Sequence, residues 1–386
     1  MAKKICGIAT LPGTVKSFML ANLNYMADRD YSAYCICNDN PPFRKDDLGK
    51  VVHIPSHLKW GYCGPIEVIR QIRWFYRVFK KEKFDIIQYA TFNAAFPASI
   101  AGWLAHVPVR INLQWGMSYA SSTGWQRVLR RTVDKFTCVF STSVQPDSKS
   151  NLKYAIEDHL YPARKGYVLY NGSACGADLK KFDILKRDEW RAGIREKHKL
   201  QNYSCVFGYV GRVVPDKGIN ELLEAFMNIG DPNTCLLLVG GLDHVDELNQ
   251  ALYQKALGTD NIIFVGPVPN PAAYFASFDF MLLPSYHEGF GMTVLESAAV
   301  GTPPIITNIK GPTDFVVNDV NGLVCEVKSV SSLQEVLNKA LNMTSSQYEI
   351  LATNAYNMVK RDFDSETYRE EFYKNRENLL SRSKHV

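Results

Sequence analysis

Short apolar runs alternate with amphipathic stretches along the whole chain, and this alternation constrains the fold more than any other feature. In the first half the strand-like runs fall at 4–10, 34–38, 51–54, 84–90, 109–115, 137–142 and 167–171. In the second half they fall at 204–211, 234–240, 261–265, 278–284, 304–307 and 322–326. Strands separated by helices pair in parallel and need helices on both faces of the sheet. The sequence therefore predicts an α/β protein with two doubly wound, Rossmann-like domains.

Helical periodicity between these runs is clearest at 15–27, 65–81, 219–227, 292–300 and 331–341, with a charged helical pair from 345 onward. The charge-rich stretch 180–201 has no strand character and separates the two series. We therefore expect an N-terminal domain at 1–180, a linker at 181–202 and a C-terminal domain at 203–363. Ligands of doubly wound sheets bind beyond the carboxyl ends of the strands. The functional residues should therefore lie there, facing a cleft between the domains.

Composition and the absence of targeting signals predict a cytoplasmic protein. The longest apolar runs are far shorter than the ~20 residues that span a membrane. Met1-Ala2-Lys3-Lys4 leads directly into a strand-like run and not into a signal peptide. Nine cysteines are scattered without paired CxxC motifs, so we expect buried free thiols and no zinc site.

The net charge is divided unevenly between the two halves. Residues 1–200 contain 31 Lys and Arg against 17 Asp and Glu, a net charge of +14, whereas the remainder carries −9. A basic half of this kind indicates an anionic partner, either a membrane or nucleic acid. No nucleic-acid-binding module is recognisable, which favours the membrane and leads us to expect no nucleic acid partner.

Two helical segments of the basic half are candidates for this membrane contact. Segment 67–83 has Val68, Ile72, Phe75 and Phe79 on one face and Arg70, Arg73, Arg77, Lys80 and Lys81 on another. A second cluster comprises Trp125, Arg127, Arg130 and Arg131. Basic helices with aromatic residues dock on anionic membrane surfaces, although an ordinary solvated helix face has the same pattern.

Two strand-to-helix loops in the second half carry candidate ligand-binding residues. Gly211-Arg212 and Lys217-Gly218 flank the first loop, and two cations beside a glycine turn and a helix N-terminus suit a diphosphate. A pair of solvated loop cations is the alternative reading of this loop alone. In the second loop, Gly266-Pro267-Val268-Pro269-Asn270, the apolar surface of Val268 and the backbone amides suit a nucleobase edge, although a simple turn has the same sequence.

A third loop, His287-Glu288-Gly289-Phe290-Gly291-Met292-Thr293-Val294-Leu295-Glu296, combines glycines, amides and two acids. Glycines at 289 and 291 let backbone amides approach a ligand, and the following helix N-terminus favours an anion. Glu296 lies one turn further into that helix than the loop, so the two carboxylates should contact different parts of a long ligand. One of them suits sugar hydroxyls and the other suits ribose hydroxyls.

The E-x7-E spacing, together with the G-R-x4-K-G loop before it, resembles the retaining glycosyltransferases of family 4, which have the GT-B fold. The similarity runs from about 206 to 341 and matches in order and spacing at 209–224, 236–240 and 282–296. A weaker match at 168–182 (VLYNGSACGADLKKF) resembles bacterial capsule and O-antigen transferases. The resemblance implies an N-terminal acceptor-binding domain, on which 364–386 packs back, and a C-terminal domain that binds a sugar nucleotide.

The resemblance also implies roles for the matched residues. Arg212 and Lys217 would hold the donor diphosphate, Glu288 the transferred sugar and Glu296 the ribose. Backbone or side-chain contacts to the donor are expected from Gly211, Val268, Gly289, Phe290, Gly291, Met292 and Thr293. The leaving phosphate itself would take the acceptor proton, so the reaction needs no metal and no cofactor. The expected donor is a UDP-sugar, with an N-acetylated hexose as the candidate sugar, and the expected acceptor is a lipid-linked sugar or glycan at the inner face of the membrane.

The N-terminal domain departs from the family pattern. Gly13 occupies the place of a glycine-rich loop near the donor phosphates, but it is the single glycine there. Gln114-Trp115-Gly116 replaces a histidine that many relatives carry. Trp115 suits stacking on a sugar or half-burial in the core equally well, and Asn171 lies on the acceptor side.

Other activities remain open on the sequence. A GT-B sugar-nucleotide epimerase would share the fold and the donor, and a non-catalytic nucleotide-sugar-binding protein would share the motif. An oxidoreductase is disfavoured because no G-x-G-x-x-G follows the first strand.

Overall fold

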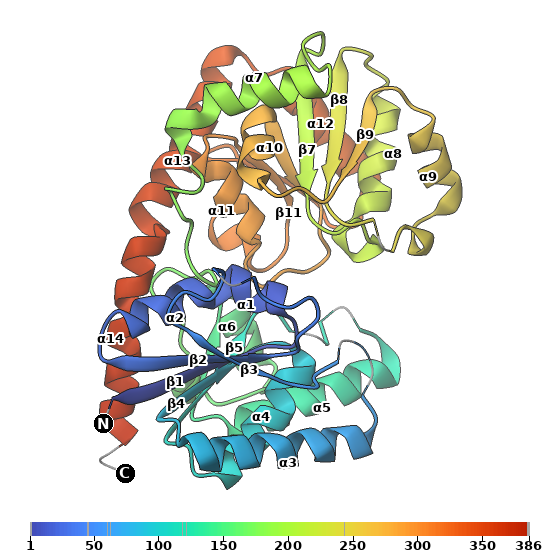
Figure 1. Cartoon of the computed structure of the whole chain (residues 1–386). Helices are drawn as coiled ribbons and strands as arrows, with labels where there is room; N and C mark the ends of the chain where they lie inside the picture. Colours follow the sequence, from blue (N-terminus) through green and yellow to red (C-terminus); the bar gives the residue numbers. More distant parts are fainter. Residues whose placement is uncertain are drawn as a thin grey trace. The chain divides into compact units, whose positions relative to one another are not determined.

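A computed structural model describes residues 2–383 except 45, 60, 62, 118, 121 and 243. The last three positions of the segment 364–386 therefore lie outside the described residues. The chain divides into two compact units. Unit 1 contains residues 1–175 and 366–386, and unit 2 is the continuous stretch 176–365. Each unit contains one parallel sheet with helices on both faces (Figure 1).

In the described part of unit 1 the sheet has six strands in the order β3-β2-β1-β4-β5-β6. They are β1 (Lys3–Ile8), β2 (Tyr31–Cys37), β3 (Val52–Pro55), β4 (Ile86–Tyr89), β5 (Val109–Gln114) and β6 (Ser143–Pro146). One face packs on α1 (Pro12–Phe18), α2 (Leu20–Ala27) and α14 (Ser365–Ser383), and α6 (Lys149–Glu157) follows β6. The other face is covered by α3 (Pro65–Glu82), α4 (Phe92–Leu104) and α5 (Gly124–Phe140) (Figure 1).

The final helix, α14, completes unit 1 through a fully buried arginine. The guanidinium of Arg376 donates to Gln88 Oε1 on β4 at 2.9 Å and to Gln145 Oε1 on β6 at 2.7 Å. It also lies 3.9 Å from the centroid of the Phe372 ring. Glu377, the next residue, pairs with Lys3 of β1 at 2.6 Å. Because buried charged groups need hydrogen-bond partners, these contacts fix α14 against the sheet.

In the described part of unit 2 the sheet again has six strands, in the order β12-β11-β10-β7-β8-β9. They are β7 (Cys205–Val210), β8 (Thr234–Val239), β9 (Ile262–Gly266), β10 (Phe280–Leu283), β11 (Pro304–Thr307) and β12 (Leu323–Cys325). One core lies under α8 (Ile219–Ile229), α9 (Gln250–Leu257) and α12 (Val330–Leu341). The other lies under α7 (Arg187–Lys197), α10 (Pro271–Ser277), α11 (Met292–Ala299) and α13 (Ser345–Asp362). Renumbered from its own first strand, this order equals that of unit 1.

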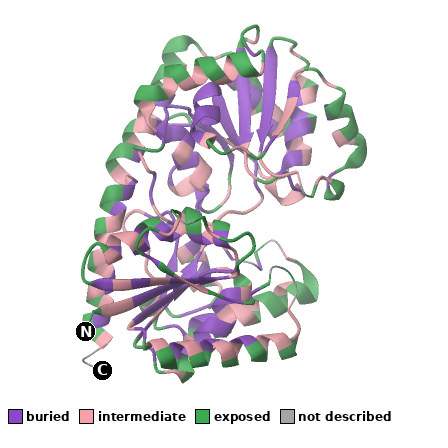
Figure 2. Cartoon of the chain, viewed as in Figure 1, coloured by how far each residue is buried: buried purple, intermediate pink, exposed green. Residues whose placement is uncertain are grey.

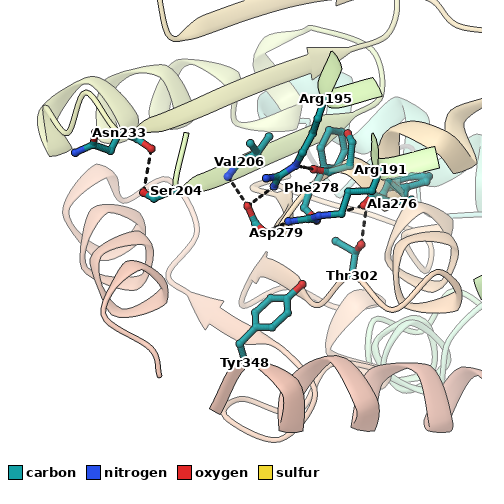
Figure 3. A network of polar contacts seen from close by, with 12 residues as sticks. Arg191, Arg195, Ser204, Val206, Asn233, Ala276, Phe278, Asp279, Thr302 and Tyr348 are labelled. Carbon is teal, nitrogen blue, oxygen red and sulfur yellow. Dashed lines mark hydrogen bonds and ion pairs between the residues drawn. The ribbon is translucent and has the colours of Figure 1, made fainter. Parts of the chain in front are cut away.

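Residues 181–202, which the sequence indicated as a linker, lie within unit 2 because α7 is bonded to its sheet. Asp279, just before β10, accepts from Arg191 at 2.5 Å and from Arg195 at 2.7 Å, both on α7 (Figure 3). The same carboxylate accepts from the amide of Val206 on β7 at 2.6 Å. Composition alone did not show that two arginines of this segment pair with Asp279 of the same unit.

Most predicted strands form within three residues of their predicted ends, and two do not form. Residues 137–142 were predicted as a strand, but α5 continues to Phe140 and β6 begins only at Ser143. Residues 167–171 were also predicted as a strand. There the positive φ angles of Tyr170 (52°) and Gly172 (108°) end the extended backbone, and Gly166 forms an isolated bridge with Val144.

Candidate active site

In unit 2 the strand order reverses between β7 and β10, which are paired in parallel. Loops that leave two such strands at the carboxyl edge run to opposite sides, which opens a binding crevice at that point. Gly218 ends the loop after β7 with φ at 70°, and a Cβ there would lie 2.0 Å from the carbonyl oxygen of Pro284. The amide of Tyr286 donates to Asp216 O at 3.0 Å. The two motif loops therefore touch because residue 218 has no side chain.

This close approach brings together two of the predicted site residues. Lys217 Nζ lies 2.7 Å from Glu288 Oε1, and the side chains are 18% and 16% exposed. Ser285 Oγ donates to the same Glu288 oxygen at 2.8 Å. The result is a half-buried cation and carboxylate, held in a fixed position and still open to a ligand. A charge-assisted pair of this kind can bind phosphate through the amine and hydroxyls through the carboxylate.

The helix after the Glu288 loop, α11, begins at Met292, directly after Gly291, whose φ is 84°. A Cβ on the neighbouring Gly311 would meet the carbonyl oxygen of Gly289 at 2.6 Å, so the loop is packed tightly from both sides. The amide of Val294 donates to Gly291 O at 2.9 Å, whereas the amides of Met292 and Thr293 are the first of α11 and have no intrahelical partner. They suit an anion or the oxygen of a ligand.

The predicted donor contacts within this loop differ in what they expose. Phe290 is buried against Phe363, with ring centroids 5.4 Å apart, so its side chain belongs to the core and its backbone alone is available. Met292 is half-buried and packs on the same core, and Thr293 is half-buried in the first turn of α11. The spacing of the glycines alone could not show which of these residues offers only its backbone to a ligand and which also offers its side chain.

Glu296 lies in the second turn of α11. Burial raises the pKa of its carboxyl to about 7, and the positive charge of Lys181 opposes that shift. Glu296 is half-buried, and among the described residues its carboxylate makes no hydrogen bond. A half-buried acid without a hydrogen-bond partner at the ligand edge of a sheet is a candidate for binding hydroxyl groups.

Arg212 projects into solvent, and within the described residues its guanidinium makes no hydrogen bond or ion pair. Its own carbonyl accepts from Tyr209 Oη at 2.7 Å, which fixes the backbone and leaves the side chain free to reach a ligand. The structure thus brings Lys217 and Glu288 together and leaves Arg212 outside that contact.

Sequence reasoning missed three polar neighbours of the pair. Ser285 donates to Glu288, and Asp216 Oδ2 lies 3.7 Å from His287 Nε2. Burial lowers the pKa of His287, and the charge of Lys217 acts in the same direction. Asp216 and His287 are adjacent in sequence to predicted residues and Ser285 is three residues before one, and this proximity was the available signal.

Gly211 and Val268 belong to loops that continue the same edge of the sheet. Gly211 N donates to Val239 O at 2.9 Å, and Gly240 N donates to Gly266 O at 2.9 Å. A Cβ on Gly240 would lie 1.8 Å from Gly211 O, so the loops after β7 and β8 pack backbone to backbone. Val268 is half-buried and packs on the core beneath α10 and α11.

The predicted residues of unit 1 lie at the carboxyl edge of its sheet or just beyond it. Gly13 is exposed in the first turn of α1, and a Cβ there would meet nothing within 4 Å. Trp115 follows β5 and packs on Phe18 with ring centroids 5.2 Å apart, which shows its contribution to the core. Asn171 is half-buried in the turn after residue 170.

Unit 1 also has polar contacts at its own point of strand reversal, between β1 and β4. Thr10 Oγ1 and Thr91 Oγ1 lie 2.7 Å apart, and Thr91 Oγ1 accepts from Thr10 N at 3.1 Å. Neither threonine was predicted. Within the described residues, no group of three or more His, Cys, Asp or Glu side chains is arranged to hold a metal.

Comparison with known proteins places this fold in a class. Residues 191–358 match the family model described as "Glycosyl transferases group 1", and residues 15–173 match "Glycosyltransferase Family 4". Both units thus match glycosyltransferase models, and the twin parallel sheets are those of the GT-B fold. The chain belongs to the GT-B glycosyltransferases that combine these two domains.

Among sequence relatives, the chain is 29% identical over 373 residues to the capsular polysaccharide biosynthesis glycosyltransferase CapM of Staphylococcus aureus, covering 96% of this chain and 95% of CapM. It is 24% identical to an Escherichia coli UDP-Gal:α-D-GlcNAc-diphosphoundecaprenol α-1,3-galactosyltransferase, covering 93% and 94% of the two chains. These homologues are bacterial transferases of capsule or lipid-linked glycan synthesis.

Among solved structures, sucrose-phosphate synthase of Thermosynechococcus elongatus has a TM-score of 0.80 at 19% identity, covering 98% of this chain and all of that one. The Anabaena protein HepE, in complex with UDP and glucose, has a TM-score of 0.78 at 18% identity, covering 97% and 100%. These likenesses confirm the predicted fold class.

Proposed function

We propose that this chain is a retaining, metal-independent hexosyltransferase that moves a sugar from a UDP-sugar to a lipid-linked sugar or glycan in surface polysaccharide synthesis. The observation that carries the proposal is the 2.7 Å contact between Lys217 and Glu288 at the strand reversal of unit 2. This position is where a doubly wound sheet binds a nucleotide ligand. The family match of the same unit supports it.

In this proposal Lys217 and Arg212 hold the donor diphosphate and stabilise the charge that grows on it as the glycosidic bond breaks. Preorganised cations at such a position typically account for a large part of catalysis. Glu288 accepts hydrogen bonds from hydroxyls of the transferred sugar, and Glu296 from those of the ribose. Gly13, Gly211, Val268, Gly289, Phe290, Gly291, Met292 and Thr293 contact the donor, and Trp115 and Asn171 serve the acceptor side.

Retention follows in this scheme because the leaving phosphate oxygen takes the proton of the attacking acceptor hydroxyl on the same face of the sugar. The name of the E. coli relative, an α-1,3-galactosyltransferase that uses UDP-Gal and a diphosphoundecaprenol-linked GlcNAc, supports the choice of donor and acceptor. The Campylobacter jejuni relative, 22% identical, also has a diphospho-undecaprenol acceptor in its name and transfers N-acetylgalactosamine. This name supports an N-acetylated hexose as one candidate sugar.

The proposed site of action is the cytoplasmic face of the membrane, where lipid-linked acceptors are accessible. Within the described residues, no helix is long and apolar enough to cross a bilayer. The basic charge of residues 1–200 supports a peripheral attachment.

The decisive experiment incubates the chain with UDP-hexoses and a polyprenyl-diphosphate-linked sugar in the presence of a chelator and follows both UDP release and product. We expect UDP release that requires the acceptor and an α-anomeric product by NMR. Glu288→Gln should reduce transfer by ~10²-fold or more, whereas Glu335→Gln, at an exposed glutamate of α12, should not. Equal transfer by the Glu288 variant would refute the assigned role.

The same experiment separates the two alternatives. A sugar-nucleotide epimerase would release UDP or convert the sugar without any acceptor. A non-catalytic sugar-nucleotide-binding protein would show donor-induced stabilisation of the fold and no turnover, since a ligand that binds the native state alone raises its stability.

A further inference from the structure

A second side-chain contact joins the two segments of unit 2 that carry Lys217 and Glu288. The hydroxyl of Tyr286, two residues before Glu288, donates to Glu221 Oε1 at 2.6 Å. Glu221 lies in the first turn of α8, four residues after Lys217. We call Lys217 with Glu288 the lysine pair, and Tyr286 with Glu221 the tyrosine pair. Both pairs connect the same two segments, but only the lysine pair contains residues assigned to the donor.

The side chain of Tyr286 is held on two sides. Burial raises the pKa of Tyr286, and the bond to Glu221 acts in the same direction, so the hydroxyl keeps its proton and remains a donor. Lys328, which follows β12, has its Nζ 4.7 Å from the centroid of the Tyr286 ring, a range at which cations attract aromatic faces. Glu221 Oε2 is buried and has no hydrogen-bond partner among the described residues. The tyrosine hydroxyl is therefore the partner on which this carboxylate depends.

The backbone just before Glu288 is anchored as well. Thr307 Oγ1, at the end of β11, donates to Ser285 O at 2.5 Å. The amide of Tyr286 donates to Asp216 O at 3.0 Å. Figure 2 shows that the strands of unit 2 are largely buried, whereas the loops that leave them are largely half-buried or exposed. A side chain that binds substrate must be held to within about 0.5 Å, and in this loop the bonds at 285 and 286 provide that support.

Donor binding would separate the roles of the two pairs. In the proposed function the diphosphate accepts hydrogen bonds from Lys217, and hydroxyls of the sugar donate to Glu288. Both interactions compete with the 2.7 Å contact between these two side chains. A charge pair that the ligand divides no longer holds the two segments together. The tyrosine pair contains no residue assigned to the donor, so it can keep its bond while the lysine pair opens.

We propose that Tyr286 and Glu221 are positioning residues that keep Glu288 at the sugar of the bound donor after its contact with Lys217 has opened. Their effect falls on the sugar part of the donor and not on the UDP part. Misplacing a group at the site by about 1 Å can cost about 10²-fold. This inference rests on the proposed function for the identity of the donor.

The test compares the dissociation constants of UDP and UDP-galactose for the full chain, with UDP-N-acetylgalactosamine as a second sugar nucleotide. Tyr286→Phe removes only the hydroxyl and should weaken UDP-sugar binding about tenfold, while UDP binding changes less than about twofold. A general disturbance of the site would weaken both alike. Tyr253→Phe is the matched control, because the hydroxyl of this α9 tyrosine makes no hydrogen bond within the described part of the chain.

Substitutions of Glu221 test the hydrogen bond from its other end. Glu221→Gln keeps an oxygen that accepts from Tyr286, so it should keep the preference of the parent for the UDP-sugar over UDP. Glu221→Ala should lose about as much of this preference as Tyr286→Phe. Glu224→Ala, at an exposed glutamate of the same helix, should lose none. Loss of the preference in the glutamine variant alone would contradict the role of the bond.

A double variant separates positioning from stability. Tyr286→Phe with Glu221→Leu removes both polar partners and leaves no buried carboxylate unpaired, so it should unfold at about the temperature of the parent. We expect its preference for the UDP-sugar to stay about tenfold reduced. A preference that recovers together with the stability would show that the pair serves the fold alone, and would overturn the proposal.

Hydrogen exchange gives a readout that needs no donor. Lys217→Met removes the lysine pair from the unliganded protein. In that background Tyr286→Phe should raise the exchange rate of the peptide 284–288 about tenfold, and Tyr253→Phe should not raise it. Equal exchange with and without Tyr286→Phe would also overturn the proposal.

Failure of this proposal is distinguishable from failure of the proposed function. A parent chain without sugar transfer would contradict the proposed function, and the exchange measurement would still decide the role of the tyrosine pair. A parent that transfers sugar, with equal weakening of UDP and UDP-galactose binding in Tyr286→Phe, would refute the positioning role and leave the proposed function intact.

Discussion

The two units have the same strand order, yet the points at which their sheets reverse carry different chemistry. In unit 1 the loops after β1 and β4 meet through two hydroxyls, Thr10 and Thr91, 2.7 Å apart. In unit 2 the loops after β7 and β10 meet through an amine and a carboxylate, Lys217 and Glu288, also 2.7 Å apart. The topology fixes where a site forms, and the loop residues decide what it binds.

The backbones at these two points also differ. Unit 2 has a glycine, Gly218, where the chain needs a positive φ and a close approach to Pro284. Unit 1 has a β-branched residue, Thr91, at φ 64° and ψ 137°. Its glycine, Gly13, lies instead in a helical turn with open space around it. Glycine is therefore required at 218 and replaceable at 13, although the sequence placed both residues in loops expected to bind the donor phosphates.

We expect the largest difference between the two units when the positive charge of Lys217 is removed from unit 2. Lys217→Met should lower kcat/KM with the UDP-sugar by about 10²–10³-fold, because a preorganised cation at the diphosphate is lost. Thr10→Val in unit 1, which removes only a hydroxyl contact, should cost less than about tenfold. Lys255→Met, at an exposed lysine of α9, serves as the control. A similar loss of kcat/KM in the Lys217 and Thr10 variants would contradict the proposal that unit 2 carries the larger part of catalysis.

The two glycines give the next test. Gly218→Ala should destabilise unit 2 by more than about 2 kcal/mol, because the new Cβ meets Pro284 O and the residue needs a positive φ. Gly13→Ala should be neutral or stabilise unit 1 by about 0.4–1 kcal/mol, because an open helical position tolerates alanine. Urea unfolding with peptide-level hydrogen exchange assigns each change to its unit. Equal effects would mean that the close contact at 218 does not limit the backbone.

A carboxyl with a raised pKa in each unit extends the comparison to pH. Burial raises the pKa of Glu296 to about 7 and that of Asp147, after β6, well above its ordinary value. An acid whose pKa is higher in the native state than in the unfolded chain keeps its proton longer when folded. Stability therefore falls as pH rises from the unfolded pKa toward the folded one.

For Glu296 this loss should occur between about pH 4.5 and 7. Glu296→Gln should thus match the parent at pH 4.5 and exceed its stability by about 1–3 kcal/mol at pH 8. Asp147→Asn should likewise be more stable than the parent at high pH, because burial raises the pKa of the Asp147 carboxyl well above its ordinary value. Thermal unfolding across this pH range measures both. A variant of Glu296 that is destabilised at pH 8 would show that the ionised carboxylate has a partner within the fold.

The smallest expected effect isolates backbone strain at Thr91. Thr91→Ala and Thr91→Gly both remove the hydroxyl, but only glycine adopts a positive φ without cost. Thr91→Gly should therefore be the more stable of the two by about 1 kcal/mol. Chemical denaturation of the pair measures the difference, and the reverse order would indicate that the backbone at 91 relaxes after substitution.

The sequence was informative where local pattern determines structure. Alternation predicted the described strands of both sheets except β6, and the glycine turn predicted the helix that begins at Met292. The contact between Lys217 and Glu288 was not predictable, since it joins residues 71 positions apart and depends on β10 pairing with β7. The inward charges of α7 and the outward apolar face of α5 were also missed. In both helices tertiary partners, Asp279 and Asp158, decide which side faces the sheet.

Helix α14 has a consequence for how the protein is made. Unit 1 is assembled from both ends of the chain, because Arg376 and Glu377 bond to strands β1, β4 and β6. During synthesis the continuous stretch of unit 2 leaves the ribosome complete, whereas the sheet of unit 1 must wait with one edge of its core uncovered. The unit that begins first is therefore the one that finishes last, and a stalled or truncated chain exposes the apolar surface that α14 covers.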